Sequence, residues 1–233
     1  MPDADPLRMF LVLRRGAIAA LARASELAGA AAVGCVRTFA DDPELGERLA
    51  EWRPRPGKVC LRARNPAQWE QVLEERHALA GEADGEGVIA LPPRRRSERG
   101  PLLERLQAMS SALEPAPERA DAADDRAAVT YVLNPTCAMS SGKIVAQVAH
   151  AAVIAADSGE AEDWVRAGCP GRLIAPPAAA FDTIAQSDVT LGWVVDAGLT
   201  EVPPGTVTVL ALPPGPAAAL PAVLTPSRHS RPG

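Results

Sequence analysis

The stretch MSSGKIVAQVAHAA, residues 139–152, joins a Gly-Lys loop end to the start of a helix. Lys143, Gln147 and His150 follow one another at spacings of four and three residues. These spacings place the three side chains within about 60° of one another on one helical face, and the apolar residues form a separate stripe. A cation, an amide and an imidazole at a helix start indicate a site for a polar, anionic ligand.

The Gly-Lys pair invites comparison with the phosphate loop of nucleoside triphosphatases. That loop requires a glycine five residues before its second glycine and a serine or threonine directly after the lysine. Cys137 and Ile144 occupy those two positions, so the sequence argues against a nucleotide triphosphatase. Cys137 is close to Lys143 in the chain, where a cation can activate a thiol, but a passive thiol is the favoured interpretation.

The second half of the chain alternates between short apolar runs and helical segments. Strands are expected at 129–133, 172–175, 189–195 and 206–212, and helices from the Gly-Lys loop to 156, at 160–167 and at 178–186. Either Ser140 or Ser141 is expected to cap the first of these helices. Strands that alternate with helices predict an α/β sandwich around a mostly buried mixed sheet.

The first half repeats this plan. Strands are expected at 9–13, 58–62 and 87–91, and helices at 17–33, 43–52 and 66–76. The segment VIALPP at 88–93 matches VLALPP at 209–214, and in both the Pro-Pro pair is expected to end the strand. Aligning Leu13 with Leu133 places Arg23 opposite Lys143 and Ala30 opposite His150, so the first copy lacks the candidate site. We predict a diverged internal duplication. The alternative is that two unrelated α/β domains share the same order of strands and helices by chance.

A change in composition marks the boundary between the halves. The predicted organisation is a degenerate α/β domain at 1–113, a linker rich in proline and charge at 114–126, the site-bearing domain at 127–224 and a disordered tail at 225–233. The two domains are expected to have similar four-stranded mixed sheets. We expect them to pack through equivalent faces as an internal pseudo-dimer, which would allow the chain to be monomeric.

The overall composition limits the classes of function. Hydrophobic residues make up 47% of the 233 residues but aromatic residues only 3%, so Ala, Val and Leu must fill the core. The net charge of −5 argues against binding nucleic acid over a wide surface, although it leaves room for a local basic patch. Four scattered cysteines and three histidines lack metal-ligand spacing, so neither a metal nor a cofactor is expected. Without a signal peptide or a long apolar run, a cytoplasmic protein with reduced thiols and no membrane contact is predicted.

A second motif follows the first by about 50 residues. It consists of Asp196-Ala-Gly-Leu-Thr200 and the strand Pro204-Gly-Thr-Val-Thr-Val-Leu210. An Asp-Ala-Gly segment alone is an ordinary end of a strand. Together with Met139, Gly142-Lys143, Ala146-Gln147 and His150-Ala151, however, it resembles the type 2 peptidyl-tRNA hydrolases, over about residues 127–220.

The resemblance implies a small α/β enzyme with a four-stranded mixed sheet that hydrolyses the ester joining a peptide to tRNA. It implies catalytic roles for Lys143, Gln147, His150, Asp196 and Thr200. Lys143 would meet a phosphate or the developing oxyanion, and Asp196 and Thr200 would orient the attacking water or the terminal ribose. For His150, a supporting role and a packing role are equally open.

This chain departs from the family pattern in the residues around the site. Family members carry further lysines in the first loop, and often an acid, an arginine and a glutamine at three other positions. The departures lie at Thr136, Ala138, Ser141, Leu199 and Glu201. From residue 127 onward five Lys and Arg stand against eight Asp and Glu, a net charge of −3. A tRNA-binding domain is expected to be more basic. Three alternatives follow. The first half supplies the cations that contact tRNA, the second half binds tRNA weakly, or it acts on another substrate.

The densest basic run is Arg94-Arg95-Arg96. A contact with the phosphate backbone of tRNA is one interpretation, and a solvated loop is the favoured one. Two functions stay open at this point. The first is a carboxylic ester hydrolase that releases peptide from tRNA, and the second is a non-catalytic tRNA- or protein-binding scaffold that kept the fold.

Overall fold

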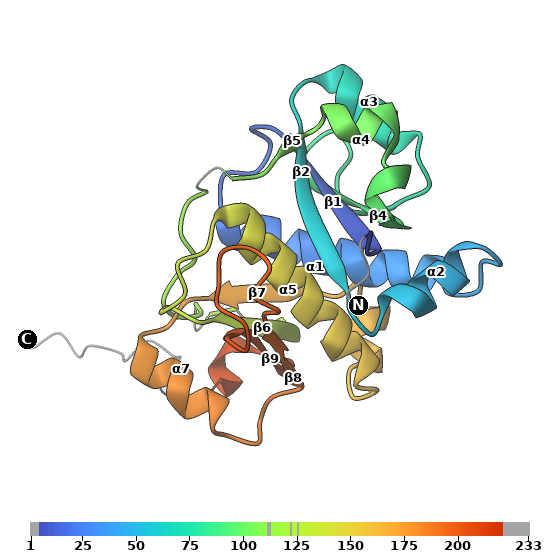
Figure 1. Ribbon diagram of the computed structural model, residues 1–233. Helices are drawn as coiled ribbons and strands as arrows, with labels where there is room; N and C mark the ends of the chain where they lie inside the picture. Colours follow the sequence, from blue (N-terminus) through green and yellow to red (C-terminus); the bar gives the residue numbers. More distant parts are fainter. Residues whose placement is uncertain (1–4, 111–112, 122, 125, 221–233) are drawn as a thin grey trace, which may run out of the picture.

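The computed structural model describes residues 5–110, 113–121, 123–124 and 126–220, and it contains two sheets with helices between and outside them (Figure 1). The tail expected at 225–233 lies outside the described residues. Within the part of the chain that the structure describes, no helix is long and apolar enough to cross a membrane.

The first half contains a five-stranded sheet in the order β3-β4-β1-β2-β5. Its strands are β1 (Arg8–Arg14), β2 (Gly57–Ala63), β3 (Ala78–Gly81), β4 (Gly87–Arg94) and β5 (Gln107–Ala108). Its helices are α1 (Leu21–Thr38), α2 (Leu45–Trp52), α3 (Pro66–Leu73) and α4 (Gly100–Arg105), with the 3₁₀ turn η1 (Arg96–Glu98). β1 and β2 are parallel, and the other neighbouring pairs are antiparallel.

The second half contains a four-stranded sheet in the order β7-β6-β9-β8. Its strands are β6 (Ala128–Leu133), β7 (Gly171–Ile174), β8 (Gly192–Val195) and β9 (Val207–Gly215). Its helices are α5 (Ser141–Asp157), α6 (Glu162–Arg166) and α7 (Ala178–Ala185), with the 3₁₀ turn η2 (Ala217–Ala219). β6 and β7 are parallel and the other pairs antiparallel, which confirms the predicted two α/β units with mixed sheets.

Four strands of each sheet follow the same plan. The run β3-β4-β1-β2 has the order and directions of β8-β9-β6-β7. Val88 lies opposite Leu13 as Val209 lies opposite Leu133, so the two echoed segments occupy the same register.

A tryptophan contact also recurs in the two halves. The indole Nε1 of Trp52 donates to the carbonyl of Gly57 at 2.8 Å, and that of Trp164 donates to the carbonyl of Pro170 at 2.7 Å. Each bond joins a helix, α2 or α6, to the residue at or just before the start of the strand that runs parallel to the central strand. The sequence comparison missed this correspondence because the two tryptophans stand at different spacings from their strands.

The prediction that the Pro-Pro pairs end their strands is wrong. β4 continues to Arg94 and β9 to Gly215, and each has a register shift opposite the start of the central strand. A bulge takes residues out of the hydrogen-bonded ladder, so prolines without an N–H are tolerated there. The strands β3 and β5 were also missed, because runs of four and two residues carry too little periodicity to be recognised.

Helices α1 and α5 form the layer between the two sheets (Figure 1). Met9 and Leu11 of β1 face this layer, where the largest buried cluster combines residues of both halves, whereas Phe10 faces the outer helices α3 and α4. Gly29 of α1 comes close to Ala152 of α5, since small residues let the helices approach. In addition α1 packs on β7 and α5 packs on β2, so each central helix contacts the sheet of the other half.

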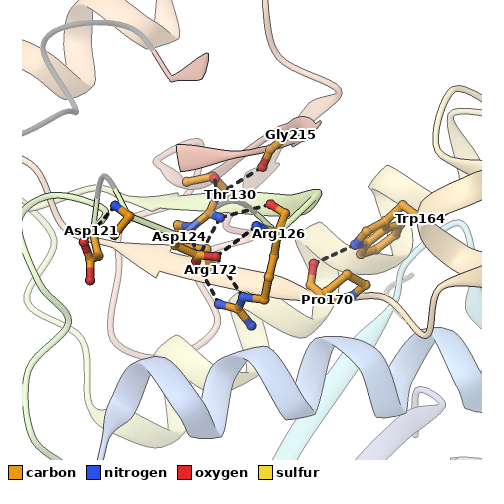
Figure 2. A network of polar contacts seen from close by, with 9 residues as sticks. Asp121, Asp124, Arg126, Thr130, Trp164, Pro170, Arg172 and Gly215 are labelled. Carbon is orange, nitrogen blue, oxygen red and sulfur yellow. Dashed lines mark hydrogen bonds and ion pairs between the residues drawn. The ribbon is translucent and has the colours of Figure 1, made fainter. Parts of the chain in front are cut away.

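The predicted linker is bound to both halves. The backbone of Glu114 bonds to that of Leu21, and the amide of Ala175 donates to the carbonyl of Pro117 at 2.8 Å. Figure 2 shows Asp124 accepting hydrogen bonds from Arg126 and from the buried Arg172 at 2.9 Å. These bonds, that from Arg126 most strongly, hold the pKa of Asp124 far below its usual range.

Arg172 finds acceptors for most of its guanidinium. It also donates to the hydroxyl of Thr130 at 3.1 Å and to the carbonyls of Arg126 and Gly215 at 3.3 and 3.4 Å (Figure 2). A buried guanidinium requires such a set of acceptors. The network attaches the linker to the end of the second sheet where β6 begins and β9 ends.

Candidate active site

The loop after β6 is held at both of its ends. The side-chain amide of Asn134 donates to the carbonyl of Val207 at 2.8 Å, and its oxygen accepts from the amide of Thr136 at 3.0 Å. At the other end Ser140 caps α5, because its hydroxyl accepts from the amide of Lys143 at 3.3 Å. The structure therefore selects Ser140 from the two predicted capping residues.

The glycine of the Gly-Lys pair is required by the first half of the chain. A Cβ at Gly142 would overlap the backbone carbonyl of Met109. Met109 follows β5, and its amide donates to the carbonyl of Cys60 at 3.0 Å. The hydroxyl of Ser141 in turn accepts from the amide of Leu113 at 2.9 Å. The segment after β5 is thus packed against the first turn of α5.

Four of the five predicted site residues form one hydrogen-bonded cluster. The Lys143 ammonium forms an ion pair with Asp196 and donates to the hydroxyl of Thr200 at 3.1 Å. The side-chain amide of Gln147 donates to the same carboxylate oxygen of Asp196 at 2.6 Å. Lys143 and Gln147 come from successive turns of α5, and Asp196 directly follows β8. The two motifs therefore meet between the start of α5 and the end of the edge strand.

The turn after β8 depends on a contact between the two parts of the second motif. The other carboxylate oxygen of Asp196 accepts from the amide of Gly198 at 2.8 Å. Gly198 has φ of +74°, and Pro204 occupies the space where a Cβ would lie. Glycine is therefore the residue this turn requires, and the Pro-Gly-Thr segment fixes the turn that presents Asp196.

Burial and hydrogen bonding compete at Asp196, whose side chain is 4% exposed. Burial is the largest single influence and would raise its pKa, but the hydrogen bonds from Lys143, Gly198 and Gln147 and the charge of Lys143 together lower it. Asp196 is therefore ionised at neutral pH. It orders a cation and an amide, and it is poorly suited to donate a proton.

One side of the cluster is open to solvent. An ammonium has three N–H donors, and Asp196 and Thr200 account for two of those on Lys143. Thr200 is exposed, and its neighbour Leu199 is 81% exposed. The arrangement can direct the third N–H of the ammonium, and the hydroxyl hydrogen of Thr200, toward a group that enters from this side.

Known proteins match the part of the chain that contains this cluster. The family model "Peptidyl-tRNA hydrolase PTH2" matches residues 128–225. A peptidyl-tRNA hydrolase of Thermococcus sibiricus is 36% identical over 89 residues, which cover 34% of this chain and 75% of that protein. This chain belongs to the PTH2 family. No solved structure matches it. The family match begins at β6, so the first half lies outside it.

The structure does not bring His150 into the cluster of this PTH2 domain. Among the described residues its ring makes no hydrogen bond, and its pKa is lowered to about 3, by burial first and then by the charge of Lys58. Lys58 belongs to β2, so His150 faces the first half of the chain. The sequence left open a supporting role in catalysis and a packing role for His150, and its neutral imidazole favours the packing role.

Glu201 is a site neighbour that the sequence indicated only as a departure from the family. Its carboxylate accepts from the amide of Ser140 at 2.6 Å and from the hydroxyl of Ser140 at 2.7 Å. It thereby ties the turn after β8 to the start of α5. An acid is favourable near a helix N-terminus. Glu201 lies 61 residues from Ser140 in the chain, however, so the sequence did not show that the two are close in space.

Cys137 lies near the cluster without being activated by it. Burial raises the pKa of its thiol, and the negative charge of Asp196 adds to that increase. A raised pKa removes the thiolate that a nucleophile requires. The passive interpretation of this thiol is therefore the one that its surroundings favour.

The basic run at 94–96 lies far from the cluster. Arg94 pairs with Glu75 at 2.6 Å, and Arg95 pairs with Glu51 of α2. Directly after α2, Arg53 pairs with Asp157 at the far end of α5. That end is about 20 Å from the start of the helix at 1.5 Å per residue. A tRNA contact in this region stays a prediction, and it would be remote from the ester.

Proposed function

We propose that this PTH2 protein hydrolyses the ester bond of peptidyl-tRNA, or of a related blocked aminoacyl-tRNA, at the cluster of Lys143, Gln147, Asp196 and Thr200. Family membership supports the reaction class. The observation that supports these residues is the convergence of both motifs on one buried carboxylate, that of Asp196. A cation held in this way is suited to a reaction in which negative charge develops on an ester oxygen.

In the proposed mechanism Lys143 stabilises the developing oxyanion. Its ammonium is ordered by Asp196 and Thr200 before the substrate arrives, so little reorganisation is needed at the moment of reaction. The N-terminus of α5 adds a favourable field for negative charge at the same place. Gln147 keeps the Asp196 carboxylate in position from the next turn of the helix.

Thr200 positions the water or the terminal ribose. Its oxygen accepts from Lys143, so its own hydrogen is available to a water molecule or to a ribose hydroxyl on the open side. Asp196, with its lowered pKa, is a weak base and acts mainly by orienting its partners. A tRNA ester is already activated, so one oriented water and one cation form a sufficient apparatus.

Release of peptide from N-blocked aminoacyl-tRNA by the purified chain tests this proposal. Wild type should turn over, and Thr200→Val should lower kcat by about 10-fold or more, since a positioned hydrogen bond is lost. Thr183→Val is a matched control, because Thr183 lies on α7 and donates only within its own helix. Wild type without turnover would remove the proposed function, and an unimpaired Thr200→Val would remove the role of Thr200.

A non-catalytic scaffold is the second candidate function. It is motivated by the net charge of −3 from residue 127 onward and by the loop positions that lack lysine. This candidate predicts weak tRNA binding with little dependence on salt, because few phosphates would be neutralised. A steep salt dependence together with turnover would decide for the hydrolase.

We propose further that the two halves arose by duplication, with residues 1–113 as the degenerate copy and 127–224 as the site-bearing one. The shared strand order, the paired tryptophan contacts and the reciprocal packing of α1 on β7 and of α5 on β2 support this proposal. In this arrangement the first half takes the place of a second subunit.

A further inference from the structure

The structure divides the basic segment at the end of β4 into arginines that pair with acids and arginines that, among the described residues, do not. Arg94 and Arg95 are neutralised by Glu75 and Glu51, as described above. The next two arginines in the chain, Arg96 and Arg99, instead line a small cavity. Of the three arginines for which the sequence suggested a phosphate contact, only Arg96 lines this cavity, and Arg99 lines it as well.

The cavity has a volume of about 100 Å³ and lies on the outer face of the first sheet, where β1 begins. Its lining residues are Arg8, Phe10, Val59, Arg96 and Arg99. Three of the five are arginines, and none of these described lining residues is an acid. In the described part of the chain the side chains of Arg8 and Arg96 make no hydrogen bond or ion pair. The cavity thus gathers positive charge that no carboxylate of its lining balances.

Arg99 is held so that one of its donors is left over. Its guanidinium lies over the ring of Phe10, 5.4 Å from the centroid, and one terminal nitrogen donates to the carbonyl of Leu103 at 3.2 Å. The Nε of Arg99 is buried and has no acceptor among the described residues. A buried donor without an acceptor is unfavourable, and so is a group of like charges around one cavity. A bound anion would relieve both.

The size of the cavity limits the anion. Its volume of about 100 Å³ is roughly three times the share of one water molecule in the liquid, about 30 Å³. Pockets for larger small molecules begin at about 300 Å³. A single tetrahedral oxyanion therefore fits, whereas the cavity is too small to enclose a nucleoside. Arginine is the preferred residue for such groups, because its planar guanidinium can donate two parallel hydrogen bonds to phosphate oxygens.

We propose that Arg8, Arg96 and Arg99 form a binding site for one phosphate group. The group has two possible sources, free inorganic phosphate and a backbone phosphate of tRNA, and the second rests on the proposed function. Glu98 of η1 pairs with Arg48 of α2 at 2.6 Å, and Arg53 directly after α2 pairs with Asp157 at the end of α5, so the site lies on the side of that end, which is remote from Lys143. A polynucleotide with a phosphate every 3.4 Å or so along each strand can reach both places.

Calorimetric titration of inorganic phosphate into the full chain, at constant ionic strength set with chloride, tests the site. Wild type should bind phosphate saturably, and Arg8→Gln/Arg96→Gln should bind it at least about 10-fold more weakly, since two charged donors are removed. Arg15→Gln is the matched control, because Arg15 is an exposed arginine just beyond the other end of β1. Equal binding by the double variant, or no saturable binding by wild type, would overturn the proposal.

Binding of tRNA by the same variants separates the two sources. A backbone phosphate predicts that the double variant binds tRNA about 10-fold more weakly, with the slope of log K against log salt reduced by about one. Unchanged tRNA binding, with phosphate binding lost, assigns the site to free phosphate. If the double variant does not fold, the single variant Arg96→Gln takes its place, because Arg96 is exposed. The phosphate titration needs no turnover, so it stands or falls independently of the hydrolase activity.

Discussion

Two ion pairs occupy corresponding places in the two halves and differ in their surroundings. Lys143 is the third residue of α5 and pairs with Asp196 next to the edge strand β8. Arg23 is the third residue of α1 and pairs at 3.0 Å with Glu86, between the edge strand β3 and β4. The side chains of the first pair are 16% and 4% exposed, those of the second 43% and 50%. A cation at the same position of the helix is thus part of a buried ion pair in one half and of a solvated one in the other, although Asp196 begins its strand connection and Glu86 ends its own.

The difference comes from the connection between the last two strands. Eleven residues join β8 to β9, whereas five join β3 to β4. The longer connection supplies Thr200 and Glu201, and the first half offers no room for their counterparts. Leu27 also stands where α5 has Gln147, when the helices are aligned by their first residues. An exposed ion pair without these partners stabilises little and orders no cation for chemistry.

Neutralising each carboxylate is the change with the largest expected contrast. Asp196→Asn should lower kcat/KM for peptide release by about 100-fold or more, because Lys143, the cation proposed to stabilise the oxyanion, loses its charged partner. Glu86→Gln should leave the rate within about 2-fold, since an exposed pair contributes little. Stopped assays on N-blocked aminoacyl-tRNA measure both. Similar losses of kcat/KM in the two variants would contradict the distinction between the buried and the exposed ion pair.

The contact between α5 and β2 contains a lysine of the first half with a buried side-chain nitrogen, Lys58, which we expect to affect stability and not catalysis. The Nζ of Lys58 is buried without a hydrogen-bond acceptor among the described residues, and burial lowers its pKa to about 7. The pKa in the unfolded chain is higher, about 10.4, so the unfolded chain binds more protons between these values and stability should rise with pH from about 7 to 10. Below pH 7 the burial penalty is fully present.

Lys58→Met should therefore stabilise the chain at pH 7, by about 1–4 kcal/mol, and by less at pH 10. Urea unfolding at the two pH values measures the difference. The cation of Lys58 also lies over the ring of Trp52, 4.6 Å from its centroid, and this contact reduces the gain. A gain that grows with pH would contradict the assignment of a buried amine whose pKa is lowered.

A smaller effect is expected at the second residue of each central helix. Gly142→Ala should destabilise the chain by about 1–3 kcal/mol, because a Cβ would displace the carbonyl of Met109. The corresponding residue of α1 is already alanine, Ala22, and Ala22→Gly should cost only about 1 kcal/mol through helix propensity. Chemical unfolding measures both. A neutral Gly142→Ala would mean that the segment after β5 is free to move away from α5.

The sequence predicted the elements of the second half well, because local signals there agree with one another. The cap at Ser140, the apolar stripe of α5 and the turn residues Gly198 and Pro204 each act within a few residues. The cluster itself was predicted from two motifs that resemble one family. What the sequence could not supply was contact between distant segments.

For that reason the surroundings of three residues, Gly142, Glu201 and His150, were not predicted. The sequence presented Gly142 only as part of the Gly-Lys pair, but the carbonyl that requires this glycine belongs to Met109 in the other half. The sequence indicated Glu201 only as a departure from the family pattern, yet its carboxylate accepts hydrogen bonds from Ser140. His150 shares a helical face with Lys143, but the angle about a helix does not say which neighbouring sheet lies beside each turn.

The central claim is that the chemistry belongs to the buried pair and not to its exposed counterpart. Single-turnover hydrolysis of N-blocked aminoacyl-tRNA by Lys143→Ala and Arg23→Ala, side by side with wild type, tests it most directly. We expect a rate at least about 100-fold lower for Lys143→Ala and a rate within about 2-fold of wild type for Arg23→Ala. A wild-type rate in Lys143→Ala, or an equal loss in Arg23→Ala, would contradict it.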